Sequence, residues 1–235
     1  EYVHQGRWIP GKHLVYVCGE IENLLLNDLY DILIIQMPPQ HGKSQTVTET
    51  LPSWYLGKFP DNRVIEISYG DDLAQRFGRR NKEKIKLYGK EIFGIELSKS
   101  SSSDTEFEIE GHTGGMISRG IMAGITGRPG DLVIVDDPIK NRQEAESKTY
   151  RDRVWDEWQN SIMTRLSAKG KVIIIMTRWH EDDLAGRLIK ATTRRLKVIS
   201  LPCEAEENDP LGRKPGDALF PEIGKDNKCV PWFPT

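Results

Sequence analysis

Five short apolar runs recur along the chain, and polar or turn-forming residues follow each of them. The runs are 31–38 (DILIIQMP), 63–70 (RVIEISYG), 131–138 (DLVIVDDP), 171–179 (KVIIIMTRW) and 196–202 (LKVISLP). Continuous apolar runs of this length are typical of strands buried on both faces of a parallel sheet. Because helix-like stretches such as 141–166 separate them, we predict an α/β fold with a mostly parallel central sheet flanked by helices.

Two further segments complete the predicted organisation. Residues 107–120 (FEIEGHTGGMISRG) alternate apolar and polar positions around a Gly-Gly pair, which predicts an antiparallel hairpin at the edge of the sheet. The serine-rich stretch 98–104 predicts an exposed loop. From Cys203 onward the chain is rich in Pro, Gly and charge, so we assign 1–202 to one domain and 203–235 to a linker.

Composition narrows the class of protein. The chain has 235 residues, 37% of them apolar, which supports one domain-sized core. Its 33 Lys and Arg residues balance 35 Asp and Glu residues, so the chain as a whole lacks the basic character of a protein that coats nucleic acid. Local basic charge gathers at 76–90 (RFGRRNKEKIKLYGK), which indicates either a nucleic-acid contact or an ordinary solvated helix face.

No apolar run approaches the roughly 20 residues of a membrane span, and the chain does not open with an export signal, so we expect a cytoplasmic protein. The first residue is Glu1 rather than methionine, which leads us to expect a piece of a longer protein.

The first apolar run leads into QMPPQHGKSQ, residues 36–45. Its second half, Gly42, Lys43 and Ser44, matches the end of the phosphate-loop pattern G-x-x-x-x-G-K-[ST], in which backbone N–H groups and the lysine bind phosphates and the hydroxyl binds Mg²⁺. Met37 replaces the first glycine of the pattern. A bare GKS also occurs in surface turns, but a strand before it and a predicted helix after it favour the phosphate loop.

A nucleotide site also needs carboxylates for the metal and for the attacking water. Asp136 and Asp137 end the buried run LVIVDD. We assign Asp136, with Ser44, to the metal, and Asp137 to orienting or activating water. Adjacent acids before Pro138 are also consistent with a simple turn.

Several other residues are candidates for the same site or for its neighbours. Thr177, Arg178 and Trp179 end the fourth apolar run, where a sensor of phosphate would lie. HEDD (180–183) lacks the spacing of a metal site, and its acids suit the first turn of a helix. Arg128, in the glycine-rich loop GITGRPGD, is a candidate for an arginine that enters a neighbouring subunit's site, with Arg119 as the competing choice.

Taken in order, six segments resemble the ATPase domain of the large terminase subunit of tailed bacteriophages. They are GRWIPGKHL, MPPQHGKS, SYGDDLAQRFGRR, TGRPGDLVIVDDPIK, MTRWHEDDLAGRL and LPCEAEENDPLGRKPGDALFP, and together they extend over nearly the whole chain. The resemblance implies a RecA-like P-loop ATPase of the additional-strand class. It also implies a ring on the viral portal that pumps double-stranded DNA into a procapsid in the host cytoplasm, with ATP and Mg²⁺ as cofactors.

The resemblance also assigns roles to individual residues. It places the nucleotide-binding residues at Trp8, His13, Pro39, Gln40, His41, Gly42, Lys43, Ser44, Gln45, Thr177 and Arg178. Catalysis falls to Lys43, Asp137 and Arg128. Many relatives have arginine at the position of Gln40 and glutamate at the position of Asp137. The aspartate side chain is one methylene shorter than glutamate.

The expected partners are DNA, portal protein, the small terminase subunit and further copies of the chain, which we expect to be monomeric when isolated. We also expect no nuclease domain within these residues and no place in the mature virion. Two alternatives stay open at this point: a helicase-like ATPase that remodels nucleic acid, and an assembly module that binds ATP with little turnover.

Overall fold

A single sheet organises the protein. The computed structural model describes residues 2–5, 8–125, 127 and 129–220, and within them eight strands form one sheet in the order β3-β4-β5-β2-β6-β7-β1-β8. The strands are β1 (Ile32–Gln36), β2 (Arg63–Ser68), β3 (Leu97–Ser102), β4 (Glu106–Ile109), β5 (Gly115–Gly120), β6 (Gly130–Asp136), β7 (Leu166–Met176) and β8 (Leu196–Ser200). From β5 to β8 every neighbouring pair is parallel, so the prediction of a mostly parallel sheet is confirmed.

The antiparallel part of the sheet differs in one respect from the prediction. β4 and β5 form the expected antiparallel hairpin, and β5 then pairs in parallel with β2. The serine-rich stretch predicted as a loop instead contains β3, which pairs antiparallel with β4 and forms the edge. The prediction was wrong because backbone hydrogen bonds to a neighbouring strand hold an edge strand, and its polar side chains are compatible with solvent.

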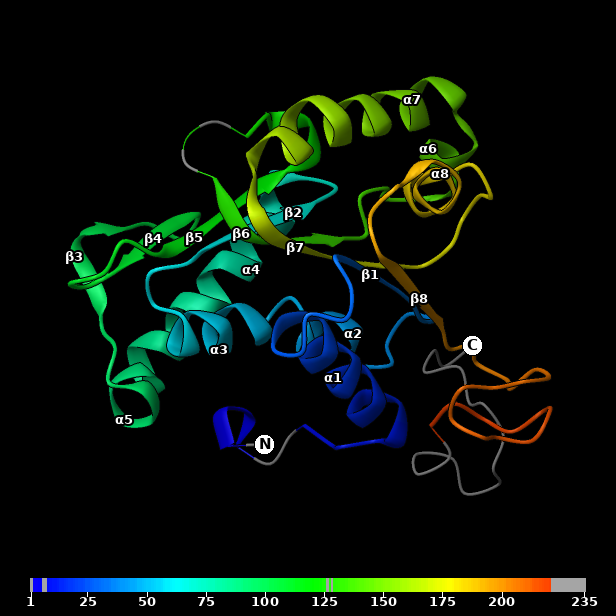
Figure 1. The fold of residues 1–235 in the computed structure, drawn as a ribbon, viewed down its shortest axis with the longest axis horizontal. Helices are drawn as coiled ribbons and strands as arrows, with labels where there is room; N and C mark the ends of the chain where they lie inside the picture. The colour runs from blue at the N-terminus through cyan, green and yellow to red at the C-terminus, as the bar shows by residue number, and fades with distance from the viewer. Residues whose placement is uncertain (1, 6–7, 126, 128, 221–235) are drawn as a thin grey trace.

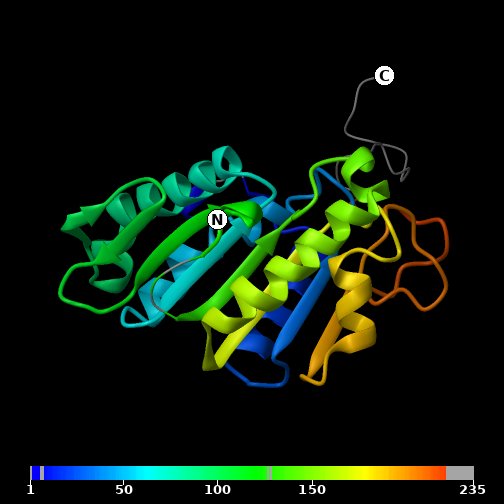
Figure 2. The same cartoon turned by 90° about the horizontal axis from the view of Figure 1, so that it is seen from above.

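Helices cover both faces of the sheet, as Figures 1 and 2 show. On one face lie α1 (Lys12–Leu25), α2 (Lys43–Thr46), α3 (Leu51–Lys58), α4 (Asp71–Lys84) and α5 (Lys90–Phe93). On the other face lie α6 (Arg142–Glu146), α7 (Lys148–Glu157) and α8 (Leu184–Ala191). Short π and 3₁₀ turns span Tyr2–His4, Ile85–Gly89, Ile121–Ala123, Trp158–Ile162 and Met163–Arg165. None of the helices in the described ranges has the length and apolarity that crossing a membrane requires.

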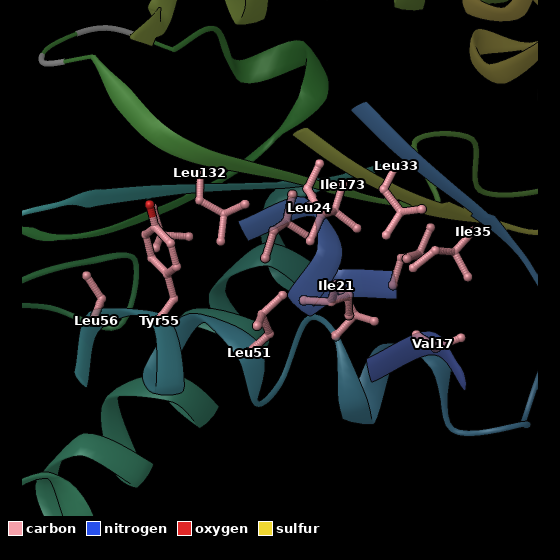
Figure 3. Packing of buried hydrophobic residues seen from close by; sticks show 14 of the residues in the cluster. Val17, Ile21, Leu24, Leu33, Ile35, Leu51, Tyr55, Leu56, Leu132 and Ile173 are labelled. Atoms are coloured by element: carbon pink, nitrogen blue, oxygen red, sulfur yellow. The ribbon is translucent and has the colours of Figure 1, made fainter. Parts of the chain in front are cut away.

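Alternating strand residues feed two separate cores. Leu33 and Ile35 of β1 pack with residues of α1 and α3 beneath the sheet (Figure 3), whereas Ile32 and Ile34 pack with residues of α7 and α8 above it. Side chains alternate between the faces of a strand, so a strand between two helical layers needs apolar residues facing both of them. Each fully buried Leu or Ile stabilises the fold by about 1.5–3 kcal/mol relative to exposure.

The first part of the segment predicted as a linker packs against the domain. Ala205 and Leu219 are buried, and Leu219 belongs to the core on the α1 side. An isolated β-bridge joins Glu204 to Ala218, and the Arg213 guanidinium lies 2.5 Å from the Asp209 carboxylate. Residues 203–220 are therefore continuous with the folded body, and a linker role for 203–235 stays a prediction.

Candidate nucleotide-binding site

The loop between β1 and α2 owes its path to two left-handed residues. Gly42, which precedes the first residue of α2, has a φ of 80°, and Gln40 has a φ of 63°. Met37, the residue in the place of the pattern's first glycine, is buried in the core beneath the sheet. Its side chain therefore turns away from the loop, which explains how a large residue is accommodated there. Pro39 and Gln40 are exposed at the tip of the loop, and His41 is partly exposed.

Lys43 joins the loop to the ends of two other strands. Its Nζ lies 2.8 Å from Asp137 Oδ2 and donates a 2.9 Å hydrogen bond to Thr177 Oγ1. Only 5% of Lys43 is exposed. Asp137 follows β6 and Thr177 follows β7, and the carboxyl ends of parallel strands meet at the edge of a sheet where ligands bind. The predicted convergence of these three residues is therefore present in the structure.

Asp136 is the second acid of the pocket and is almost completely buried. It ends β6 with 1% exposure, and Thr48 Oγ1 donates a 2.6 Å hydrogen bond to its Oδ2. Burial, followed by the charge of Asp137, raises the pKa of Asp136 to about 7, while Thr48, Lys43 and Ser44 act in the opposite direction. The carboxylate is thus next to both Lys43 and Ser44, as the sequence predicted, and its negative charge is poorly solvated.

Backbone geometry brings the two adjacent acids to the same pocket. Neighbouring residues of a strand point to opposite faces, but Asp137 has a φ of 44°, in the left-handed region. Its backbone N–H donates to Ile175 O, and its Oδ1 accepts a 2.8 Å hydrogen bond from the Thr177 backbone N–H. A left-handed non-glycine residue costs on the order of 1 kcal/mol, and these contacts hold it in place.

Two of the predicted nucleotide-binding residues near the N-terminus contact the loop and the helix that follows it. Trp8 Nε1 donates a 2.9 Å hydrogen bond to Thr46 Oγ1, and both residues line a largely apolar pocket of about 220 Å³. His13 Nε2 lies 3.0 Å from the backbone oxygen of His41, and its ring packs 5.1 Å from that of Phe220. His13 therefore contacts the phosphate-type loop, and Trp8 contacts α2, the helix that follows the loop.

Three other predicted residues make contacts with groups other than Lys43 and the two acids. Arg178 Nε donates a 2.7 Å hydrogen bond to Asp183, so its guanidinium faces the turn at 180–183. Gln45 Nε2 lies 3.5 Å from a ring nitrogen of His4. Arg119 pairs weakly with Glu106, at 3.9 Å. Arg128 lies outside the described residues.

The HEDD stretch forms the expected helix start. Asp183 precedes α8 and accepts a 2.9 Å hydrogen bond from the Gly186 backbone N–H, as a helix cap does. In the part of the chain that the structure describes, no group of three or more His, Cys, Asp or Glu residues is arranged to hold a metal ion.

Sequence reasoning missed three buried polar residues around the site, Thr48, Glu66 and Asn81. Glu66 lies in β2 and accepts a 2.6 Å hydrogen bond from Ser68 Oγ. Burial raises its pKa well above the ordinary range, and the charge of Asp136 adds to this effect. A charged residue inside the apolar run 63–68 was a signal in the sequence, whereas nothing local distinguished Thr48 or Asn81.

Comparison with solved structures shows likeness in fold at low sequence identity. The large terminase of a thermophilic bacteriophage, solved in complex with ATP-gamma-S, aligns with a TM-score of 0.51 and 12% identity over 81% of this chain and 44% of that chain. The N-terminal domain of the DNA packaging ATPase of bacteriophage phi29 aligns with a TM-score of 0.51 and 9% identity over 76% of this chain and 94% of that chain. The RecA-like α/β fold class is therefore confirmed.

A mutant ATPase domain of the Thermus phage P74-26 large terminase is also similar, with a TM-score of 0.46 and 18% identity over 66% of this chain. The chain spans 63% of that domain and less than half of the terminase solved with ATP-gamma-S. A comparison with curated protein sequences finds no match.

The family follows directly from the sequence. Residues 34–231 match the sequence model described as "Terminase large subunit, T4likevirus-type, N-terminal". This match extends over most of the 235 residues and includes the loop, both acids and the end of β7. The chain belongs to the family of T4likevirus-type terminase large subunits, as part of their N-terminal region.

Proposed function

We propose that this chain hydrolyses ATP with the help of Mg²⁺ and that hydrolysis drives double-stranded viral DNA into a procapsid. The observation that carries the proposal is the convergence of Lys43, Asp136, Asp137 and Thr177 beside a phosphate-type loop. The family of the chain supports the ATPase part, and the motor role rests on the family alone.

Lys43 and its two partners supply the polar chemistry of the pocket. The Lys43 ammonium is held at the loop by Asp137 and Thr177, so it is available to bind the phosphates of ATP. Asp137, which the Thr177 N–H and Lys43 orient, is the group that would accept a proton from the attacking water.

The donor set fits magnesium. Ser44 and Asp136 offer a hydroxyl and a carboxylate, the hard oxygen ligands that Mg²⁺ prefers. A cation bound there would favour the ionised form of Asp136, whose pKa burial raises to about 7. The ion would neutralise charge on the phosphates. The pocket lined by Trp8 and by Thr46, the last residue of α2, is our choice for the adenine base.

DNA contact is assigned to the exposed face of α4. Arg76, Arg79 and Arg80 are exposed there, and Lys86 follows on the next turn. Contacts to DNA phosphates need only such a surface and carry no sequence preference. In this proposal the chain acts in a ring on the portal with the small terminase subunit, in the host cytoplasm, and Arg128 or Arg119 reaches the neighbouring site.

Phosphate release from ATP by the purified chain tests the proposal. We expect weak, Mg²⁺-dependent turnover that rises with protein concentration, because the arginine comes from a neighbour. Lys43→Ala should abolish the turnover, whereas Lys190→Ala, which removes an exposed lysine of α8, should leave it unchanged. Equal turnover in the two variants would refute the assignment of the pocket.

A further inference from the structure

Thr48 is a buried residue that contacts the metal-binding acid of the proposed site. It lies between the end of α2 and the start of α3 and has no solvent exposure. Its Oγ1 donates the 2.6 Å hydrogen bond to Asp136 Oδ2. A hydrogen bond to a carboxylate is strong and directional, so it fixes the rotation of the Asp136 carboxyl group as well as favouring its charge. Thr48 thus occupies the place of an outer-shell partner to a metal ligand.

Asn81 of α4 holds Thr48 through its backbone. Its Nδ2 donates a 2.8 Å hydrogen bond to the Thr48 backbone oxygen and a 3.0 Å hydrogen bond to Phe77 O in its own helix. Its Oδ1 accepts a 3.0 Å hydrogen bond from the Ser53 backbone N–H. The side-chain amide therefore uses both donor hydrogens and its acceptor, and it is fully buried.

The contact with Ser53 has a specific structural reason. Ser53 lies in the first turn of α3, where backbone N–H groups have no partner within the helix. Thr50, the residue before α3, makes no side-chain cap hydrogen bond. Asn81 thus caps α3 from a different helix and at the same time fixes the α2–α3 connection at Thr48. One amide ties α4 to the connection that contacts Asp136.

We propose that Thr48 and Asn81 are positioning residues of the ATPase site: Asn81 fixes the Thr48 backbone, and Thr48 orients the Asp136 carboxylate to bind magnesium. The inference rests on the proposed function. Through this pair, helix α4, which presents the basic surface assigned to DNA, is connected to Asp136 by two consecutive hydrogen-bonded contacts.

The test measures binding of a non-hydrolysable ATP analogue as a function of Mg²⁺ concentration. In Thr48→Val, which keeps the shape of the side chain and removes the hydroxyl, the Mg²⁺ concentration at half-saturation should rise by about tenfold or more. Thr48→Ser, which keeps the hydroxyl, should stay within about twofold of wild type. Binding of the analogue without Mg²⁺ should be equal in all three proteins, a pattern that loss of packing alone would not produce.

A double-mutant cycle tests the role of Asn81. Asn81→Ala should raise the Mg²⁺ requirement in the same direction as Thr48→Val, and the double variant should be no worse than Thr48→Val alone, because both act through one hydrogen bond. Asn160→Ala, at an exposed asparagine, is the matched control. If the effects of Asn81→Ala and Thr48→Val on the Mg²⁺ requirement add up in the double variant, Asn81 does not act through Thr48. If Asn81→Ala does not fold, the comparison of valine with serine at position 48 still decides the role of Thr48.

The outcomes separate this inference from the proposed function. Wild-type protein that shows no Mg²⁺-dependent binding of the analogue would refute the proposed function itself. Wild-type binding with normal Mg²⁺ dependence, together with an identical dependence in Thr48→Val, would overturn the positioning role and leave the ATPase assignment intact.

Discussion

Replacing Glu66 by glutamine should change how the stability of the protein depends on pH. Glu66 has no solvent exposure, lies in the central strand β2, and accepts a 2.6 Å hydrogen bond from Ser68. Burial, with the charge of Asp136 as a further contribution, raises its pKa well above the ordinary value. The folded protein therefore keeps a proton on Glu66 at pH values where the unfolded chain has released it.

The sign and size of the effect follow from proton linkage. When the folded pKa is raised, the stabilisation is complete below the unfolded pKa of about 4.3 and is lost as pH rises toward the folded pKa. Within that window the folded protein binds one more proton than the unfolded chain. Each unit by which the pH rises therefore lowers the free energy of unfolding by about 1 to 1.5 kcal/mol. Glu66→Gln removes this titrating group. The melting temperature of the variant minus that of wild type should therefore increase by roughly 2–6 °C for each unit by which the pH rises.

Thermal unfolding followed by circular dichroism between pH 5 and 8, without nucleotide or Mg²⁺, measures this difference. The titration of Asp136, whose pKa lies at about 7, occurs in both proteins and largely cancels. Glu207→Gln, at an exposed glutamate, is the control and should give a curve parallel to wild type. Parallel curves for Glu66→Gln would show that Glu66 releases its proton at the same pH in both states. That result would refute the reasoning from burial.

Three further predictions concern the site, the DNA surface and the C-terminal segment. Asp137→Asn should lower phosphate release at least about 100-fold while Mg²⁺-dependent nucleotide binding persists, because general base catalysis contributes about 10²–10⁴-fold; full turnover would contradict the catalytic role. Replacing Arg79 and Arg80 by alanine should weaken binding of double-stranded DNA and reduce the slope of log affinity against log salt by about 2, as measured by fluorescence anisotropy; an unchanged slope would remove this surface. Leu219→Ala should lower the free energy of unfolding in urea by about 2–5 kcal/mol, since Leu219 is 2% exposed in the core; a change below about 0.5 kcal/mol would show that 203–220 is not part of the cooperative unit.

Much of the site was determined by local sequence. The apolar runs that became β1, β2, β6, β7 and β8 were recognisable because strands covered on both faces need apolar residues on both faces. Polar residues at the ends of β1, β6 and β7 then had to meet, since parallel strands bring their carboxyl ends to one edge. This is why Lys43, Asp136 and Asp137 could be assigned to one pocket from the sequence alone.

Other features depended on contacts between distant parts of the chain. The order of the strands and the pairing of the serine-rich β3 rest on backbone hydrogen bonds between strands. Such bonds require no particular side chain, so the sequence did not predict them. The left-handed turn at Asp137 is held by backbone groups of Ile175 in β7 and of Thr177 just after it, and the Arg178 guanidinium donates to Asp183. Asn81 acquires its role only when α4 packs against the α2–α3 connection.

The physical reason for this division is the range of the interactions involved. Burial preference and turn chemistry act on a residue and its immediate neighbours, so they leave a pattern in the sequence that predicts strands, helices and the end of the sheet where the site lies. A hydrogen bond between Thr48 and Asp136 joins residues 88 positions apart and leaves no such pattern. The sequence alone therefore determined the fold class and the principal charged residues of the pocket, and the tertiary structure decided how those residues are oriented and which buried groups support them.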